Sequence, residues 1–383
     1  MSQPKDFGFG EEETMLRDAA RKLLRDEGDV ATLRATVAKS HIEAYETSPQ
    51  PVAYDEKLWR RMVELGWSSV AVPEAAGGLG MKMVAVAALA EELGRAAVPS
   101  PLPSTLAATL VLRECDGDGA RSALERIAGG DPATLAVTDE TGSWESGDTS
   151  VTARTDGKHT LLDGTAWFVQ DARKAAFFVC AARGRDGVGL FVVPADAPGV
   201  KIHPDQIVDL TRDQARVELK QVEVAATAIA APCGKGPAAL ERALPGMLTI
   251  LAADMAGAAE WQLQTTVEYA KIRKQFDKPL GYFQAVKHPL ANMMIAIDRA
   301  RSLAYNAACA IDTEPNKALL FARMAKAAAA DAAAFCSGRS VQLHGGIGFT
   351  WECDVHIWFK RQKHSQQLLG DGIYQRAKLA SLM

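Results

Sequence analysis

The sequence lacks long apolar runs and paired cysteines, and each absence excludes a class of protein. No apolar stretch approaches the roughly 20 residues of a membrane-spanning helix, and the first six residues contain no apolar core of a secretory signal. The six cysteines are scattered without a Cys-x-x-Cys pair, and the seven histidines form no cluster with metal-ligand spacing. We therefore expect a reduced, cytoplasmic protein with no membrane association and no metal site.

An excess of positive charge is missing as well. The 43 Lys and Arg residues are balanced by 47 Asp and Glu, which leaves a net charge of −4. A nucleic-acid surface needs clustered cations to neutralise phosphates, so we expect no nucleic-acid partner. With 23% charged and 48% hydrophobic residues among 383, the composition is typical of a soluble globular protein, and the length predicts two or three domains.

The residue pattern divides the chain into three domains. Residues 1–128 have helical periodicity, residues 129–228 have short runs typical of strands, and residues 229–383 are helical again. Five segments show the apolar spacing of helices: 11–26, 58–65, 82–94, 245–272 and the alanine-dense 321–343. The alanine-dense segment predicts close helix packing, either within the core of a bundle or between subunits.

The middle domain reads as a small all-β unit. Its β-branched and aromatic runs recur at intervals of roughly 8–12 residues, at 134–138, 150–154, 159–162, 166–169, 175–181, 189–193 and 215–218. Asp-Gly pairs stand at 156–157, 163–164 and 186–187. Because Asp-Gly adopts the tight turns that join antiparallel strands, each pair predicts a hairpin.

Two motifs in the C-terminal domain indicate dinucleotide binding. The first is Tyr-x-x-x-Arg-x-Gln-Phe-x-x-Pro-x-x-x-Phe-Gln, which begins at Tyr269 and contains Arg273, Gln275, Phe276, Phe283 and Gln284. A guanidinium is a permanently charged, bidentate ligand for a pyrophosphate. The alternative is a helix C-terminus whose cations only complement the helix dipole. The second motif, Gln342-Leu-His-Gly345-Gly346, ends a helix with glycines that permit close approach of a ligand.

Together these motifs resemble the acyl-CoA dehydrogenase family over nearly the whole chain. The resemblance implies an α+β multidomain fold with an N-terminal helical domain, a central β-barrel or sandwich and a C-terminal four-helix bundle. It also implies that Arg273, Gln275, Phe276, Phe283 and Gln284 hold the FAD pyrophosphate of a neighbouring subunit. Gln342, Gly345 and Gly346 would then pack against the adenosine diphosphate half of that FAD.

The segments that surround the flavin ring in this family are only partly kept. Thr138 and Trp167 stand at two matching positions, and we expect both to contact the ring. The Gly-Ser-Asp turn of the family is absent, and Val169 replaces the residue whose hydroxyl would contact the flavin. This half of the FAD site therefore looks degraded.

The catalytic base of the family is also missing. Removal of the α-proton of an acyl thioester requires a carboxylate near Cα. The family places its Glu nine residues after an Arg, which gives Gly370 here, or 22 residues before the signature Tyr, which gives Met247. Asp371 adjoins Gly370 and is the one weak candidate, against the alternative of a solvated or helix-capping Asp.

Three hypotheses follow from the resemblance. The motifs for the pyrophosphate and the adenosine diphosphate half of FAD are intact, whereas those for the flavin ring are degraded. This combination favours a base-less subunit of a heterotetrameric, FAD-dependent acyl-CoA dehydrogenase. Such a subunit would be similar to the paired subunits of bacterial steroid side-chain degradation. The second hypothesis is a self-sufficient homotetramer that uses Asp371, and the third is a structural paralogue that binds no flavin. The family implies an acyl-CoA substrate and an electron-transferring flavoprotein as acceptor.

Overall fold

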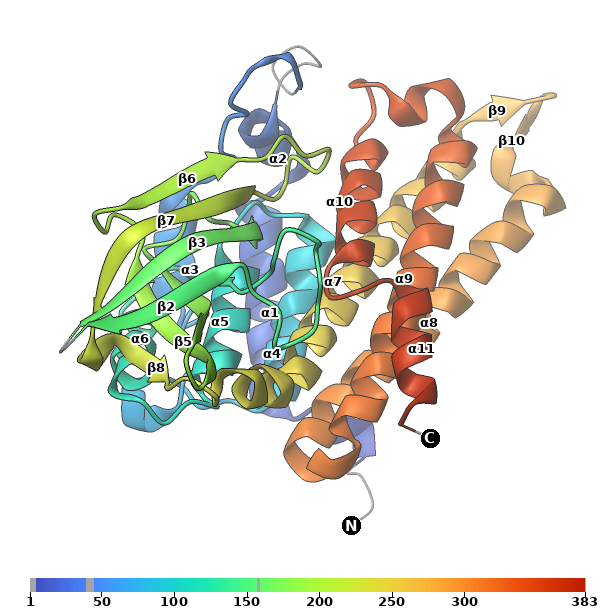
Figure 1. Cartoon of the computed structure of the whole chain (residues 1–383). Coiled ribbons are helices and arrows are strands. Elements are labelled where there is room, and N and C mark those ends of the chain that lie inside the picture. The colour runs from blue at the N-terminus through green and yellow to red at the C-terminus, as the bar shows by residue number, and fades with distance from the viewer. Residues whose placement is uncertain (1–4, 39–44, 157–158, 383) are drawn as a thin grey trace.

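A computed structural model describes residues 5–38, 45–156 and 159–382. The strands lie on one side of the molecule, the longest helices lie on the other, and the N-terminal helices pack between them (Figure 1). This order of helices, sheet and helices confirms the predicted fold class. In the described part of the chain, no helix is long and apolar enough to cross a membrane.

The N-terminal part is a set of helices centred on a buried one. The helices are α1 (Glu11–Asp26), α2 (Val30–Val37), α3 (Glu56–Glu64), α4 (Met83–Ala96), α5 (Leu102–Leu112) and α6 (Asp118–Ala128). Helix α4 is buried along nearly its whole length. It crosses a C-terminal helix at two glycines, since a Cβ on Gly94 would lie 1.9 Å from the carbonyl oxygen of Asp254 and one on Gly257 would lie 1.9 Å from that of Glu91.

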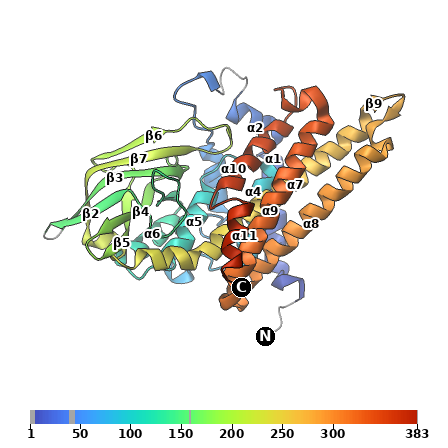
Figure 2. The same cartoon turned by 45° about the vertical axis from the view of Figure 1, so that its right-hand side comes forward.

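The middle part is one sheet of eight strands. They are β1 (Ala133–Ala136), β2 (Val151–Asp156), β3 (His159–Gln170), β4 (Phe177–Gly184), β5 (Gly187–Pro194), β6 (Val200–Pro204), β7 (Gln214–Ala225) and β8 (Ile229–Ala231). The order is β6-β7-β3-β2-β4-β5-β8, with β1 parallel to β4. Figure 2 shows the strands β6, β7, β3 and β2 one below another beside the helices. Its apolar residues form a separate core around Phe178, Phe191 and Val217.

The structure corrects several expectations for the strands. The runs 159–162 and 166–169 belong to one strand, β3, and Asp163-Gly164 is an irregularity inside it and not a turn. Gly164 has φ +133, and a Cβ on it would lie 2.3 Å from the carbonyl oxygen of Ser150, so only glycine fits. Asp186-Gly187 does join β4 to β5, whereas Gly157 lies outside the described residues. Strands β6 and β8 were not predicted, and both are short.

The C-terminal part consists of three long helices and two shorter ones. They are α7 (Gly236–Ile272), α8 (Gln284–Thr313), α9 (Pro315–His344), α10 (Val355–Gln367) and α11 (Gly372–Ala380). Helices α7 and α9 begin nine and six residues before the predicted starts at 245 and 321. A proline normally ends a helix because it has no N–H, yet Pro245 is buried inside α7, where packing of both flanking turns outweighs the missing hydrogen bond.

Candidate functional site

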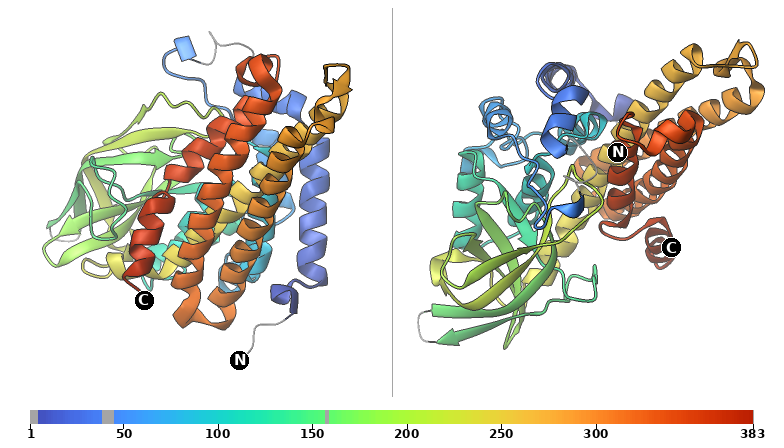
Figure 3. Two further views of the ribbon diagram at one scale, coloured as in Figure 1. Left: turned by 90° about the vertical axis from the view of Figure 1, so that its right-hand side faces the viewer. Right: turned by 90° about the horizontal axis from the view of Figure 1, so that it is seen from above.

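The first motif forms the tip of an arm that extends from the helical bundle (Figure 3). Helix α7 ends at Ile272, and Arg273 caps it in an extended conformation. Two-residue strands β9 (Lys274–Gln275) and β10 (Lys278–Pro279) then form a hairpin whose turn residues, Phe276 and Asp277, have φ 51° and 61°. A short 3-10 helix, η5 (Leu280–Tyr282), leads into α8.

The side chains at this tip face solvent. Phe276 is 86% exposed and meets the ring of Phe283 edge-on at 6.2 Å. Arg273, Gln275 and Gln284 are exposed too. Within the described chain, the Arg273 guanidinium has no hydrogen-bond or ion-pair partner. An unpaired cation beside exposed aromatic rings is the arrangement that binds a phosphate and a flat ring from outside the chain.

The second motif lies at the same end of the bundle. The His344 ring stacks on Tyr269 at a centroid distance of 4.4 Å, which joins the C-terminal ends of α9 and α7. Gln342, Gly345 and Gly346 are exposed, and the amide of Gln342 accepts a hydrogen bond from Arg339. Gly345 has φ +65, and no atom lies within 4 Å of a Cβ built on either glycine. The backbone here is open to close approach.

A second region holds Thr138, one of the two residues predicted to contact the flavin ring, whereas the other, Trp167, lines neither of its cavities. Two neighbouring cavities lie between the sheet, α7 and the segment that joins α10 to α11. The outer cavity has a volume of about 250 Å³ and the inner one about 110 Å³. Both are lined by Thr138, Trp144, Met247 and Leu369.

The structure changes the expected roles of the strand residues at these cavities. Thr138 lines both cavities, and its carbonyl accepts the N–H of Trp167 at 2.9 Å. The expectation for Val169 was wrong, since its side chain is buried in the core of the sheet domain. A register shift between Ala166 and Val169 turns Phe168, with φ +53, toward the inner cavity in its place.

Neither expected base position carries a carboxylate, and Gly370 has no room for one. Met247 is 6% exposed and fills the boundary of the two cavities. Gly370 has φ +88, and a Cβ on it would lie 2.1 Å from Cδ1 of Tyr374. Real Cβ atoms do not approach a ring carbon so closely. Any side chain at position 370 therefore requires Tyr374 to leave its place.

The neighbouring Asp371 is engaged as a helix cap. Its Oδ1 accepts the backbone N–H of Tyr374 at 2.8 Å, which begins α11. It does not line either cavity. Below it, the buried Lys326 donates to the carbonyls of Gly370 and Gln366 at 2.9 and 3.0 Å. Burial lowers the pKa of Lys326 to about 7, and Asp371 raises it by a smaller amount.

Other carboxylates near the long helix are already paired. Asp254 binds Arg361 and Arg212, and Glu260 binds Arg301. Glu241 lies at the rim of the outer cavity, where it accepts a hydrogen bond from Ser146 at 2.7 Å. Among the described residues, the carboxylates that line the outer cavity are Glu241 and Glu145, which also accepts a hydrogen bond, from Tyr374, and the inner cavity is lined by none.

Comparison with known proteins identifies the family. Models of the N-terminal, middle and C-terminal domains of acyl-CoA dehydrogenases match residues 10–131, 134–222 and 234–382. The acyl-CoA dehydrogenase IpdE2 of Mycobacterium tuberculosis is 33% identical over 360 residues, which cover 94% of this chain and 93% of that protein. The chain belongs to the acyl-CoA dehydrogenase family. This is a family of flavoprotein oxidoreductases, and one structure similar to this chain is that of a steroid acyl-CoA dehydrogenase.

Two solved structures are similar over nearly the whole chain. One is a variant of the Tcur3481–Tcur3483 steroid acyl-CoA dehydrogenase, with 34% identity, a TM-score of 0.85 and 98% of both chains covered. The other is the ChsE4–ChsE5 complex of Mycobacterium tuberculosis, with 25% identity, a TM-score of 0.86 and 98% of both chains covered. Both names describe pairs of proteins.

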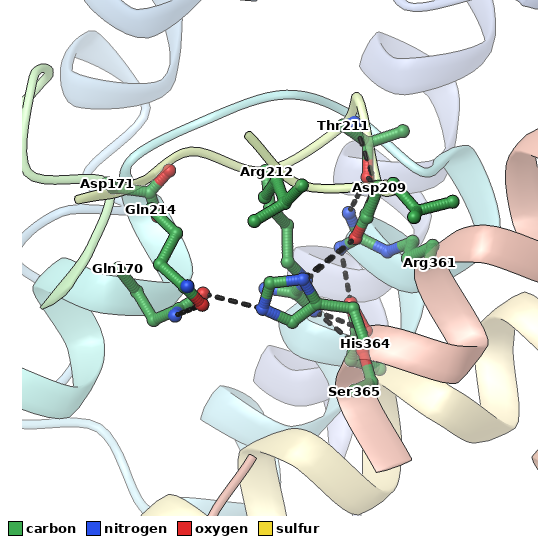
Figure 4. Close-up of polar contacts among 12 residues, drawn as sticks. Gln170, Asp171, Asp209, Thr211, Arg212, Gln214, Arg361, His364 and Ser365 are labelled. Atoms are coloured by element: carbon green, nitrogen blue, oxygen red, sulfur yellow. Dashed lines mark hydrogen bonds and ion pairs between the residues drawn. The ribbon is translucent and has the colours of Figure 1, made fainter. Parts of the chain in front are cut away.

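A buried polar network, which no sequence pattern indicated, holds the acyl-CoA dehydrogenase fold together behind the inner cavity (Figure 4). Arg361 donates to Thr211 at 2.9 Å and to Asp254, so α10 is tied to α7 and to the loop before β7. His364 contacts Gln170 at 2.9 Å, and burial lowers its pKa to about 4, which keeps it neutral near pH 7. By fixing α10, the network also fixes the segment 368–371 that follows it.

FAD, the cofactor of this family, fits one part of the chain and not the other. At the arm, the free Arg273 and the open Gly345-Gly346 backbone suit a pyrophosphate and an adenosine. The inner cavity of about 110 Å³ is well below the roughly 300 Å³ at which ligand pockets begin. Trp144 and Phe168 occupy its walls. In these positions the side chains leave the inner cavity by itself too small for an isoalloxazine ring.

Proposed function

We propose that this chain is the base-less subunit of a heterotetrameric, FAD-dependent acyl-CoA dehydrogenase that desaturates an acyl-CoA thioester between Cα and Cβ. The observation that carries the proposal is the contact at Gly370, where a Cβ would lie 2.1 Å from the ring of Tyr374. The position that bears the base in most relatives is thus closed to any side chain, and Met247 offers no carboxylate either.

The exposed arm supports the second half of the proposal. Arg273, Gln275, Phe276, Phe283 and Gln284 would hold the FAD of a partner subunit, and Gln342, Gly345 and Gly346 would contact its adenosine. The partner would supply the carboxylate and the flavin-ring pocket. Similarity to proteins named as pairs supports this assignment, and the one of them that is named a steroid acyl-CoA dehydrogenase favours a bulky acyl group. We propose an electron-transferring flavoprotein as acceptor from the family resemblance alone.

The test is to purify the chain alone and together with a paralogous subunit that carries the Glu. FAD per protomer, mass in solution and acyl-CoA oxidation are measured for both. We expect well under one FAD per chain and no turnover for the chain alone, and bound FAD with turnover for the pair. One FAD per chain with turnover in the isolated protein would refute the proposal and point to the homotetramer.

Variants distinguish the roles within the pair. Arg273→Gln should lower the FAD content of the complex, because a charge-assisted hydrogen bond contributes about 1.5–3 kcal/mol. Arg121→Gln is the matched control, since Arg121 is an exposed residue of α6 paired only with Asp118. Asp371→Asn should leave turnover of the pair unchanged. Loss of turnover in that variant would instead favour the self-sufficient enzyme.

A further inference from the structure

Two stacked aromatic rings join the ends of the two helices that carry the FAD motifs. Tyr269 lies in the last turn of α7, and His344 is the last residue of α9. Their ring centroids are 4.4 Å apart, with an angle of 23° between the ring planes. His344 is 5% exposed, and its Nδ1 lies 2.8 Å from the carbonyl oxygen of Ser340. Because a carbonyl only accepts, Nδ1 carries the proton, and this hydrogen bond fixes the orientation of the His344 ring.

The same seam between α7 and α9 contains a hydrogen bond one turn earlier. The hydroxyls of Thr266 and Ser340 lie 2.8 Å apart, and both residues are fully buried. The Thr266 hydroxyl donates its one proton to the carbonyl of Gln262 at 2.6 Å, so Ser340 is the donor to Thr266. Residues one turn apart share a face of a helix. The hydrogen bond and the stack therefore hold the two helices in one register up to their last turns.

Both FAD motifs begin directly at the stack. The N–H of Arg273 donates to the carbonyl of Tyr269 at 2.9 Å. On the other helix, Gly345 follows His344 in the sequence, and its N–H donates to the carbonyl of Gln342. The guanidinium-bearing residue and the first glycine of the open backbone are thus each one covalent or hydrogen-bonded step from a stacked ring.

The arm has no second fastening of this kind to the glycine loop. Among the residues that the structure describes, no hydrogen bond or ion pair joins the arm, residues 273–283, to α9 or to the short 3-10 helix η6 (Gly345–Phe349). The spacing between the two motifs therefore depends on the seam between α7 and α9, and the ring stack is the contact of that seam nearest to both.

We propose that Tyr269 and His344 are positioning residues for FAD, whose stack fixes the spacing of Arg273 and the Gly345-Gly346 backbone at which one dinucleotide contacts both. Neither ring has to touch the cofactor. Two binding elements that are held in place before the ligand arrives do not have to be ordered when it binds, which strengthens binding. The identity of the ligand rests on the proposed function, whereas the fastening of the two motifs is a property of this chain alone.

Amide hydrogen exchange on the full chain tests the fastening without any cofactor. The N–H groups to follow are those of Arg273 and Leu280 at the base of the arm, hydrogen-bonded at 2.9 and 2.8 Å, and that of Gly345. In Tyr269→Leu these three amides should exchange about threefold faster or more, because the stack no longer opposes local opening of the two helix ends.

FAD affinity then tests the positioning role. The complex with the Glu-bearing partner, freed of flavin, is titrated with FAD, and binding is followed by flavin fluorescence. Tyr269→Leu and His344→Leu should each weaken binding about three- to tenfold, the range that the energy of an aromatic pair gives. Since either change removes the same stack, the double variant should bind FAD about as well as the weaker single variant.

Two control variants separate positioning from general stability. Tyr269→Phe keeps the ring and should leave FAD affinity and amide exchange within twofold of the wild type. Leu248→Ala changes a fully buried residue of α7 that lies about 30 Å along the helix from Tyr269. It should lower the stability of the chain and still leave FAD affinity within twofold. If the stack served stability alone, FAD affinity would instead fall in Leu248→Ala as well.

The inference is overturned if both leucine variants bind FAD within twofold of the wild type, if Tyr269→Phe binds as weakly as Tyr269→Leu, or if the two single losses multiply in the double variant. Unchanged amide exchange in Tyr269→Leu would also overturn it. Arg273→Gln on the same complex reports on the proposed function. Loss of FAD in that variant without loss in the ring variants would refute the positioning role alone, whereas a wild-type complex without FAD would refute the proposed function.

Discussion

Replacement of Gly370 by Ala tests the contact that closes the base position. Gly370 has φ +88, where an L-residue costs roughly 1–2 kcal/mol. The added Cβ would lie 2.1 Å from Cδ1 and 2.7 Å from Cγ of Tyr374. Overpacking of this kind costs about 1–3 kcal/mol. We therefore expect the free energy of unfolding to fall by about 2–5 kcal/mol, measured by urea titration followed by tryptophan fluorescence.

A double-mutant cycle separates the two contributions. In a Tyr374→Ala background the ring is gone, so Gly370→Ala should cost only the roughly 1–2 kcal/mol of backbone strain. Gly338→Ala in α9 is the matched control, because Gly338 is exposed and no atom lies within 4 Å of its added Cβ. That change should stabilise the protein by about 0.5–1 kcal/mol.

The reasoning is refuted if Gly370→Ala costs the same in both backgrounds, or less than about 0.5 kcal/mol in the wild type. Either result would mean that Tyr374 moves away readily. Gly370→Glu would then be expected to create a base, and acyl-CoA oxidation by that variant would overturn the base-less interpretation as well.

Three further predictions concern the core. Asp254→Asn should destabilise the protein by about 3–5 kcal/mol in urea titration, because it leaves Arg212 and Arg361 buried without their carboxylate; exposed Asp298→Asn should cost under about 1 kcal/mol. The pKa of Lys326 is about 7 when folded and 10.5 when unfolded, so the unfolded chain binds more protons between these values and stability rises with pH there. The rise should be up to about 1.4 kcal/mol per pH unit relative to Lys326→Met, and parallel pH curves for the two proteins would contradict it. Gly257→Ala should cost about 2–3 kcal/mol or more by thermal or urea unfolding, because its Cβ would lie 1.9 Å from the carbonyl oxygen of Glu91; a neutral effect would show that α4 and α7 separate easily.

Local patterns in the sequence were sufficient for the fold class and the family. Apolar spacing gave α1 its full extent at Glu11–Asp26, since the side chains of an amphipathic helix repeat along one face. The signature around Arg273 predicted the break after α7 and the restart at Gln284. Both features depend on residues that are close together in the sequence. Such residues also lie close together in space whenever the helix or turn forms, whatever the rest of the fold is.

Contacts between residues far apart in the sequence decided the buried polar network and the lining of the cavities. Asp254 pairs with Arg361, 107 residues away, and Arg212 and Arg361 meet only because α7, α10 and the loop before β7 come together. A shift in register turned Phe168 to the cavity and Val169 to the core, which strand periodicity does not encode.

The expected base position at Gly370 shows what the sequence determines and what the tertiary structure adds. The sequence by itself determined that no carboxylate stands at Gly370 or Met247. Only the tertiary structure decided that a side chain has no space at Gly370, because the start of α11 brings the ring of Tyr374 against its Cα.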